Sequence, residues 1–297
     1  MPNLIVCCYY RAMSYLDRIK YCNTWKPDHY LPWIIEGDIY GWVRPAFAQL
    51  LQDDWPDLFT ISDQQLLLNP LLNTYQERTD QLAPVIRELH QRGVIDTWVN
   101  ENYPVNHQFA ERGMLEIERA ATLYFGAASY GVHLNGLVKK ADGIYVWVAI
   151  RARDKPFFPG MLDQMVAGGQ PVGMGLLENM LKEAAEEAAI PVSIARDMTQ
   201  VGQISYAQEV ERGVDRSTIY IFDLWLPEDF EPENTDGEVD EFRLLPIEEV
   251  MALTENTAEF KDNCNLVNID LFLRLKRLTE THEDYPLILQ QLYHQQR

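Results

Sequence analysis

The sequence has little of what several specialised protein classes need. Four of its 297 residues are cysteines, and no two of them are spaced as Cys-x-x-Cys. They are Cys7, Cys8, Cys22 and Cys264. With 6 histidines in addition, a zinc ribbon is not expected, and so few cysteines do not build a disulfide scaffold. A reducing, cytoplasmic setting is therefore predicted.

Basic residues and long apolar runs are also scarce. Lys and Arg total 25 against 45 Asp and Glu, which gives a formal net charge of −20 at pH 7. Nucleic acids and anionic membranes are held by clustered Lys and Arg, so neither partner is expected. The strongly apolar run 144–150 is far shorter than the ~20 residues that cross a bilayer. The short run 4–10 meets Arg11 at once, and no secretory signal is predicted there.

What is present indicates a packed globular protein. Hydrophobic residues make up 47% of the chain and aromatic residues 11%, which excludes wholesale disorder. At roughly 150 residues per domain, the length suggests two domains. A change of character near 115–125 predicts an N-terminal α+β domain over 1–120 and a second domain over 121–297.

Local patterns predict the main elements. Two β-rich runs around Gly37 predict a hairpin, and apolar residues at helical spacing predict a helix over about 80–90. The other expected elements are a helix over 114–125, strands over 130–138 and 144–150, and helices over 247–253 and 265–279.

The segment 168–190 carries the most chemical information. Glu183, Glu186 and Glu187 follow one another at helical spacing, within an arc of about 100° on a helix expected over 175–188. Four apolar residues form the face that docks this helix, namely Leu177, Leu181, Ala184 and Ala188. Fixed carboxylates beside a permissive Gly168-Gly169 loop suit Mg²⁺ or Mn²⁺ bridging a diphosphate. The alternative is an ordinary solvated helix face.

These residues resemble the Nudix box, in which a glycine and a glutamate precede an Arg-Glu-apolar-x-Glu-Glu-x-Gly-apolar segment at fixed spacing. The positions in register are Gly168, Glu183, Glu186, Glu187 and Ile190. Lys182 stands in place of the arginine, Met174 in place of the first glutamate and Ala189 in place of the last glycine. Glu178, four residues before Lys182, is predicted to brace it instead, the alternative being an ordinary surface pair.

The resemblance extends over nearly the whole chain. The similar stretches are 38–45, 155–169, 204–206, 211–213, 234–242 and 260–264. They resemble the thiamin-pyrophosphokinase-related Nudix hydrolases, which carry an N-terminal domain of unknown function (DUF4743). The similarity begins near Ser14, which makes Met13 a candidate natural start. The fold implied is α+β, with a C-terminal Nudix α/β/α sandwich around a mixed sheet, preceded by a smaller α+β domain.

The activity implied by the resemblance is metal-dependent hydrolysis of a diphosphate linkage, with Mg²⁺ or Mn²⁺ as cofactor. Glu183, Glu186 and Glu187 are then metal ligands, and Glu186 or Glu187 is the general base. Glu238, on an acidic loop, is expected to be a further ligand, against the alternative of a solvated acid. Gly168 and Gly169 are expected to border the substrate. The subgroup implies thiamine diphosphate or its damaged analogues, cleaved to the monophosphate.

Other side chains leave alternatives open. Arg151 and Arg153 follow a strand at alternating positions, where they either grip phosphate oxygens or cover the sheet. His133 is expected to be structural. Other substrates are nucleoside diphosphate derivatives, dinucleotides or prenyl diphosphates, and other functions are a non-catalytic diphosphate-binding module or a structural adaptor. The partner expected is a small-molecule diphosphate, and the sequence leaves a homodimer open.

Overall fold

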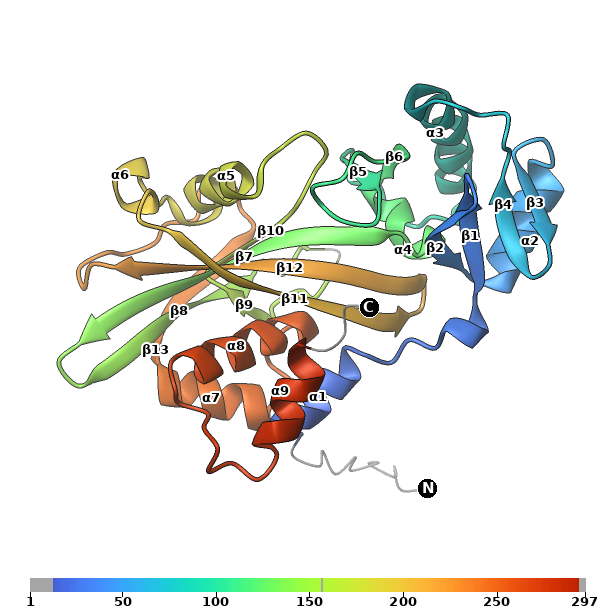
Figure 1. Cartoon of the computed structure of the whole chain (residues 1–297). Helices are drawn as coiled ribbons and strands as arrows, with labels where there is room; N and C mark the ends of the chain where they lie inside the picture. Colours follow the sequence, from blue (N-terminus) through green and yellow to red (C-terminus); the bar gives the residue numbers. More distant parts are fainter. Residues whose placement is uncertain (1–12, 156, 294–297) are drawn as a thin grey trace, which may run out of the picture.

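The computed structural model describes residues 13–155 and 157–293 (Figure 1). Cys7, Cys8 and the run 4–10 lie outside them. Over the described residues, the first part of the chain forms a small sheet with two helices, and the later part forms a large mixed sheet between helices. A ribbon of β5 (Asn102–Val105) and β6 (Leu115–Glu118) lies between the two.

The small sheet has the order β2-β1-β4-β3. The predicted hairpin is confirmed, because β1 (Leu31–Ile35) and β2 (Asp38–Val43) are joined by Glu36 and Gly37, whose φ angles of 52° and 92° suit a tight hairpin turn. The rest of this part is β3 (Phe59–Ser62), β4 (Gln65–Leu68), α2 (Pro45–Asp54) and α3 (Tyr75–Gln91). Helix α3 contains the predicted helix and begins at a capping box of Thr74 and Glu77.

The large sheet has the central order β11-β12-β7-β8-β13, with β10 paired to β7 and β9 paired to β8. Strands β7 and β12 run parallel and their other pairings are antiparallel, so the sheet is mixed as expected. The strands are β7 (Ala128–Lys140), β8 (Gly143–Arg151), β9 (Leu162–Gln164), β10 (Val166–Gly169), β11 (Thr199–Val210), β12 (Gly213–Leu226) and β13 (Val239–Pro246). Strands β7 and β8 confirm the two predicted strands.

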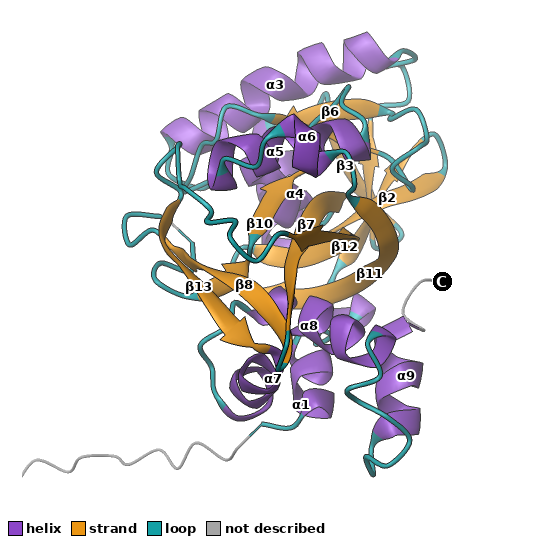
Figure 2. Cartoon of the chain, turned by 90° about the vertical axis from the view of Figure 1, so that its left-hand side faces the viewer, coloured by secondary structure: helices purple, strands orange, loops and turns teal. Residues whose placement is uncertain are grey.

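Helices cover both faces of this sheet (Figures 1 and 2). Helices α5 (Leu176–Ala188) and α6 (Val192–Ala195) lie on one face, with a core that includes Met180, Ala184 and Phe222. The opposite face carries α7 (Ile247–Asn256), α8 (Asp262–Arg274), α9 (Tyr285–Tyr293) and α1 (Tyr15–Tyr21). The expected α/β/α sandwich is therefore confirmed.

Helix α1 belongs to the core of the C-terminal helices although it comes first in the chain. The Tyr15 ring lies 6.1 Å from the Phe272 ring, and the Arg18 Nε–H donates to the Thr254 carbonyl at 3.0 Å. Leu16 and Ile19 are buried in the same cluster. The early segment thus closes the lower layer of the sandwich. The division at residue 120 stays a prediction.

The expected helix over 114–125 is wrong. Its first residues form strand β6, in which Leu115 and Ile117 alternate inward and pair with β5. The chain then makes a 3₁₀ turn over Arg119–Ala121 and one short helix, α4 (Thr122–Phe125). Pairing with the preceding strand β5 overrides the local helical pattern here.

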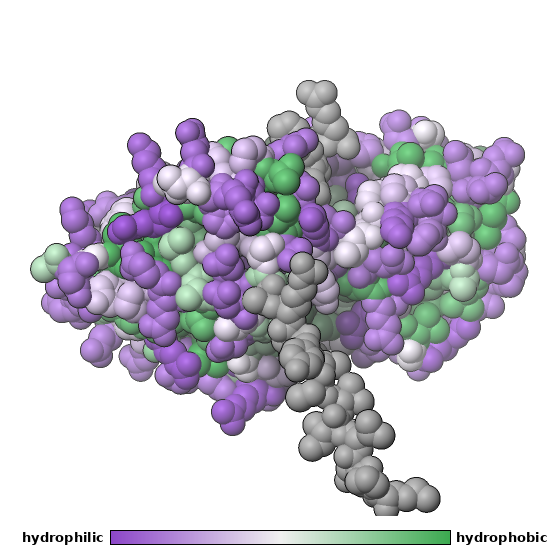
Figure 3. All heavy atoms as spheres, turned by 90° about the horizontal axis from the view of Figure 1, so that it is seen from below, coloured by the Kyte–Doolittle hydropathy of each residue, from purple (hydrophilic) through white to green (hydrophobic). Residues whose placement is uncertain are grey.

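The two parts of the molecule pack closely together. The Tyr30 hydroxyl donates to the Gly213 carbonyl at 2.9 Å, and Arg212 pairs with Asp96 at 2.7 Å. Gly126, with φ 56°, lies so close to β2 that an added Cβ would come within 2.2 Å of the Trp42 carbonyl oxygen. Seen from below, hydrophilic residues predominate on the surface and apolar ones lie in separate groups (Figure 3). Among the described residues, no helix combines the length and apolar character that crossing a membrane requires.

Candidate active site

Gly168 and Gly169 end strand β10 rather than forming the expected loop. They pair with Val132 and Gly131 of β7, so their backbone is ordinary extended strand. The reason for glycine is space. A Cβ added at Gly168 would lie 2.5 Å from the Glu183 Cδ, so only glycine lets this carboxylate rest against the strand. Gly168 therefore positions the first glutamate of the stripe.

Helix α5 presents its acids at different depths. Met180, Ala184 and Ala188 are fully buried, but Leu177 is 50% exposed and Ala185 is exposed too, so the expected docking face is rotated. This rotation buries Glu187, which is 5% exposed. Glu183 is mostly buried at the strand, and the Glu186 side chain is 49% exposed.

Glu187 is an uncompensated buried acid. Its Oε2 accepts a hydrogen bond from the Ala167 N–H at 2.9 Å. Burial raises the pKa of Glu187 well above its ordinary value, the Ala167 N–H opposes this, and the charges of Asp163, Glu183 and Glu238 raise the pKa further. The pKa of Glu183 is also raised, chiefly by burial, against the opposing charge of Lys182. The acids on α5 and Glu238 therefore share one electrostatic neighbourhood.

Lys182 is the cation next to the stripe. Its Nζ lies 3.2 Å from Glu183 Oε1 and 2.8 Å from Glu186 Oε2. Glu178 does not take the predicted bracing role, because its Oε2 accepts from the Gly175 N–H at 3.3 Å and so caps the start of α5. Ala189, at the position of the last glycine of the box, ends the helix with φ 50° in the left-handed region.

Glu238 comes to this neighbourhood from the loop before β13. Its carbonyl accepts from the Ala152 N–H at 2.9 Å, which fixes its backbone beside the end of β8. Its carboxylate forms an ion pair with Lys155, and its charge acts on both Glu183 and Glu187. The charge of this loop acid therefore acts on the helix acids, and its role as a ligand stays a prediction.

The two arginines after β8 lie apart from one another. Arg151 Nη1 donates to Asp163 Oδ2 at 2.8 Å, and its Nη2 donates to the Phe157 carbonyl at 3.2 Å. The Arg153 side chain is 91% exposed and lies 3.9 Å from Asp240. Arg151 therefore serves a buried ion pair in this structure, and phosphate binding by either arginine stays a prediction.

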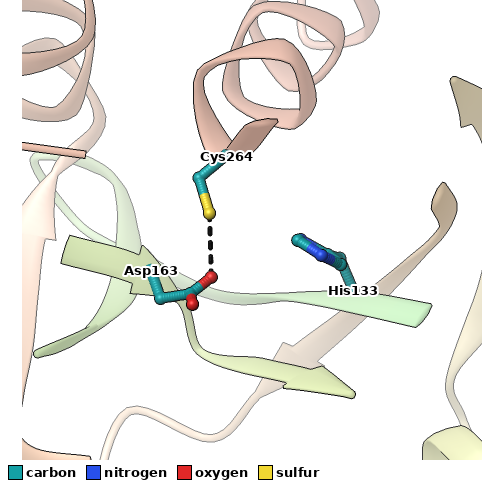
Figure 4. Close-up of side chains that lie close together, drawn as sticks. All are labelled: His133, Asp163 and Cys264. Atoms are coloured by element: carbon teal, nitrogen blue, oxygen red, sulfur yellow. Dashed lines mark hydrogen bonds between the residues drawn. The ribbon is translucent and has the colours of Figure 1, made fainter. Parts of the chain in front are cut away.

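A second cluster lies on the other side of the sheet, beside α8. Among the described residues, one group of three potential ligands has its ligand atoms within 4.8 Å of one another: His133 of β7, Asp163 of β9 and Cys264 of α8. Figure 4 shows the Cys264 thiol directed at the Asp163 carboxylate, and this Sγ donates to Oδ1 at 2.8 Å. His133 Nδ1 lies 2.8 Å from Gln164 Oε1, in line with the expected structural histidine.

Charge argues against a cation in this second cluster. Arg151 and Lys261 lie 2.8 Å and 3.5 Å from Asp163 Oδ2. Burial works to raise the pKa of Asp163, but Lys261, His133 and Arg151 outweigh it and hold the pKa well below the usual range. Burial lowers the pKa of His133 to about 4, so its ring is neutral at pH 7. Two cations already balance one carboxylate, so a further cation here would meet positive charge on Arg151 and Lys261.

Tyr103 and Arg119 also border the site, and sequence reasoning did not find them. A Cβ added at Gly169 would lie 1.8 Å from the Tyr103 Oη and 3.0 Å from the Arg119 Cζ. Tyr103 lies on β5 and Arg119 begins the 3₁₀ turn after β6, so both are far from the box in sequence. No local pattern marks them, because tertiary packing alone brings them to the strand.

Comparison with known proteins places the chain in a family. Residues 14–129 match the model described as "Domain of unknown function (DUF4743)". Nudix hydrolase 24, chloroplastic, from Arabidopsis thaliana is 39% identical over 265 residues, which span 88% of this chain and 72% of that protein. Nudix hydrolase 20, chloroplastic, from the same plant is 38% identical over 272 residues, with the same coverage of 88% and 72%. The chain belongs to the Nudix hydrolase family.

The resemblance inferred from the box is thereby confirmed, including the DUF4743 domain, and the chain is a Nudix-type diphosphate hydrolase. The solved NUDIX domain of Shewanella oneidensis NrtR, complexed with ADP ribose, is also similar, at 17% identity and a TM-score of 0.40 over 51% of this chain and 90% of that one. Nudix hydrolases generally use divalent cations such as Mg²⁺, and the carboxylates of the α5 acids and of Glu238 are the type of hard-oxygen donor that such an ion prefers.

Proposed function

We propose that this Nudix hydrolase is a metal-dependent diphosphatase whose site lies at the end of β10. The observation that carries the proposal is Glu187. This buried carboxylate receives its hydrogen bond from a neutral N–H, and its pKa is raised by burial and by neighbouring acids. Such a group destabilises the fold unless a cation offsets its charge, and perturbed carboxylates of this kind are typical of functional sites.

The roles follow from position. Glu183, Glu187 and Glu238 would hold Mg²⁺ or Mn²⁺, with Glu186 as a further ligand at the exposed end of the stripe. A bound divalent cation neutralises diphosphate charge and lowers the pKa of a coordinated water. Glu186 or Glu187 would take the proton of the attacking water, and Gly168 and Gly169 would border the substrate at the strand end, where they make room for Glu183, Tyr103 and Arg119.

The substrate we propose is thiamine diphosphate or a damaged analogue, cleaved to the monophosphate, as the resemblance to the thiamin-related subgroup implies. Nucleoside diphosphate derivatives are the second candidate. A cavity of about 590 Å³ beside the loop that follows β10 offers room for the group that the diphosphate carries. It lies between the segment 104–113 and the loop 171–175, with Phe109 and Met174 in its lining.

A substrate panel tests this proposal. We expect Mg²⁺- or Mn²⁺-dependent phosphate release from thiamine diphosphate or its oxidised analogues, with the monophosphate identified by mass spectrometry. Nucleoside diphosphate sugars, dinucleotides and prenyl diphosphates form the comparison set. No release from any compound, together with thermal stabilisation by the same compounds, would favour the non-catalytic binding module.

We also propose a reducing, cytoplasmic location, which the buried free thiols of Cys22 and Cys264 support. The two plant relatives are named chloroplastic. A homodimer is proposed as the assembly, to be tested by light scattering. The net charge of −20 supports a small-molecule substrate rather than a nucleic acid.

A further inference from the structure

The residue of interest is Arg119, which the DUF4743 segment contributes at the end of β6. Its backbone N–H donates to the Glu101 carbonyl at 2.8 Å, which fixes the start of the 3₁₀ turn Arg119–Ala121. Leu115 and Ile117 anchor the preceding strand in the N-terminal core. The base of this side chain is therefore held by packed structure rather than by a free loop.

The guanidinium is held in place by two neighbours. Arg119 Nη1 donates to Glu101 Oε2 at 3.0 Å, and its Cζ lies 5.4 Å from the centre of the Tyr103 ring. Tyr103 is 3% exposed, so the ring forms a rigid platform. The Arg119 side chain is still 42% exposed. Because a guanidinium has five N–H donors, several stay accessible to a ligand.

Arg119 and Glu183 meet β10 at adjacent glycines. The Glu183 carboxylate packs against Gly168, and the guanidinium packs against Gly169. Successive residues of a strand face opposite ways, so the two groups flank the strand end. The charge of Glu238 acts on both groups. It raises the pKa of Glu183. Burial lowers the pKa of Arg119, but Tyr103, Glu101 and Glu238 outweigh burial and raise this pKa on balance. The Arg119 guanidinium thus lies at the same strand end as the Glu183 carboxylate, across β10 from it.

We infer that Arg119 binds the diphosphate of the substrate from the N-terminal side of the strand end, with Tyr103 and Glu101 as the residues that position it. The inference rests on the proposed function and adds a binding residue from outside the Nudix box. It gives a reason for glycine at position 169, where an added Cβ would collide with the Tyr103 hydroxyl and press against the Arg119 guanidinium. A planar guanidinium donates two parallel hydrogen bonds to a phosphoryl group, which an ammonium does not.

The test uses the full chain and two readouts. We expect Arg119→Ala to weaken Mg²⁺-dependent binding of methylenediphosphonate, measured by calorimetry, by about 10- to 100-fold. On the substrate that the wild type cleaves, KM rises by a similar factor while kcat changes less than about threefold, as for a group that binds ground and transition states alike. Arg119→Lys keeps the charge but not the paired donors, and recovers part of the affinity.

Arg92 offers a matched control. Its side chain is 39% exposed, it pairs with Asp54 at 2.7 Å, and it lies 5.7 Å from the Trp55 ring centre, so Arg92→Ala removes an arginine in similar surroundings away from the site. Gly169→Ala should copy Arg119→Ala, whereas Gly202→Ala, with nothing within 4 Å of the added Cβ, should have no effect.

The outcomes separate the two claims. Unchanged diphosphonate affinity in a folded Arg119→Ala protein overturns the role of Arg119 and leaves the proposed function standing. An equal loss in Arg92→Ala also overturns it, because the effect would then come from net charge alone. If the wild type neither binds methylenediphosphonate with Mg²⁺ nor releases phosphate from the panel, both proposals fall.

Discussion

Asp163 and Glu187 are two carboxylates at similar depth in opposite electrostatic surroundings. Asp163 is 3% exposed and Glu187 is 5% exposed. Asp163 forms ion pairs with Arg151 and Lys261 and accepts a hydrogen bond from the Cys264 thiol. The charges of Arg151 and Lys261 outweigh burial and lower the pKa of Asp163. Glu187 has a backbone N–H and further acids around it, and burial and these acids raise its pKa.

The difference is between an acid whose charge is balanced inside the fold and an acid for which we propose a functional role. A buried charge balanced by nearby cations and hydrogen bonds belongs to the packed interior. A buried charge without such balance lowers stability, and its presence indicates a ligand of opposite charge. The tight cluster of His133, Asp163 and Cys264 has more varied ligand atoms, yet we propose the looser glutamates of α5 as the cation site.

The largest expected effect is on stability, from Asp163→Asn. Removing this charge leaves Arg151 and Lys261 unpaired beside each other, and we expect a loss of about 3–5 kcal/mol of unfolding free energy. In the wild type, the folded pKa lies below the ordinary 3.8, so this contribution is present above pH 3.8 and is lost as pH falls through the folded pKa. Urea unfolding at several pH values measures both. Glu241→Gln, in an exposed pair with Arg243, is the control that should leave stability unchanged.

Glu187→Gln should act in the reverse sense. We expect a rate at least ~100-fold lower, about 2.7 kcal/mol of activation free energy, because a metal ligand is lost. Without metal, the melting temperature at pH 7 should rise, since the variant keeps the acceptor for the Ala167 N–H but buries no charge. Because the pKa of Glu187 is raised in the folded state, its contribution to wild-type stability is fully present below pH 4.5 and is lost as pH rises through the folded pKa. The higher melting temperature of Glu187→Gln should therefore disappear in acid.

Activity assays and thermal melts with EDTA or Mg²⁺ check this contrast. Mg²⁺ should stabilise the wild type by mass action and leave Glu187→Gln little changed. Glu186→Gln, at the exposed end of the stripe, should not raise the melting temperature. Wild-type turnover by Glu187→Gln at saturating Mg²⁺ would contradict the proposed role of Glu187 as a metal ligand.

The smallest effect comes from the end of the same helix. Ala189 has φ 50°, a conformation that costs an L-residue more than glycine, so Ala189→Gly should stabilise the protein by about 0.5–1 kcal/mol. Ala185→Gly, at an exposed position inside α5, should instead destabilise it by about 1 kcal/mol. Chemical denaturation distinguishes the two signs, and a destabilising Ala189→Gly would contradict the cap geometry.

Sequence reasoning succeeded where the determinants are local. The turn at Gly37, strands β7 and β8, and helix α5 follow from patterns within a few residues, and Glu183, Glu186 and Glu187 lie on the predicted helix. It failed where the residues that decide the structure lie outside this local window. Residues 115–118 pair with β5 instead of forming a helix, and Leu177 is exposed because α5 is rotated. Arg151 forms an ion pair with Asp163, which lies beyond the following loop. Sequence reasoning also could not explain the glycines at 168 and 169, because the explanation is the close packing of Glu183 and Arg119 against them in the folded protein.

The position of helix α1 affects how the chain can be truncated and how it folds during synthesis. An excised fragment that starts at residue 121 would lack the helix that covers Phe272, and would expose a strip of apolar surface to self-association. During synthesis, α1 can pack into the core that it shares with α8 and α9 only after those helices have left the ribosome. Expression plasmids for the catalytic half should therefore supply residues 14–22 as well, in cis or as an added peptide.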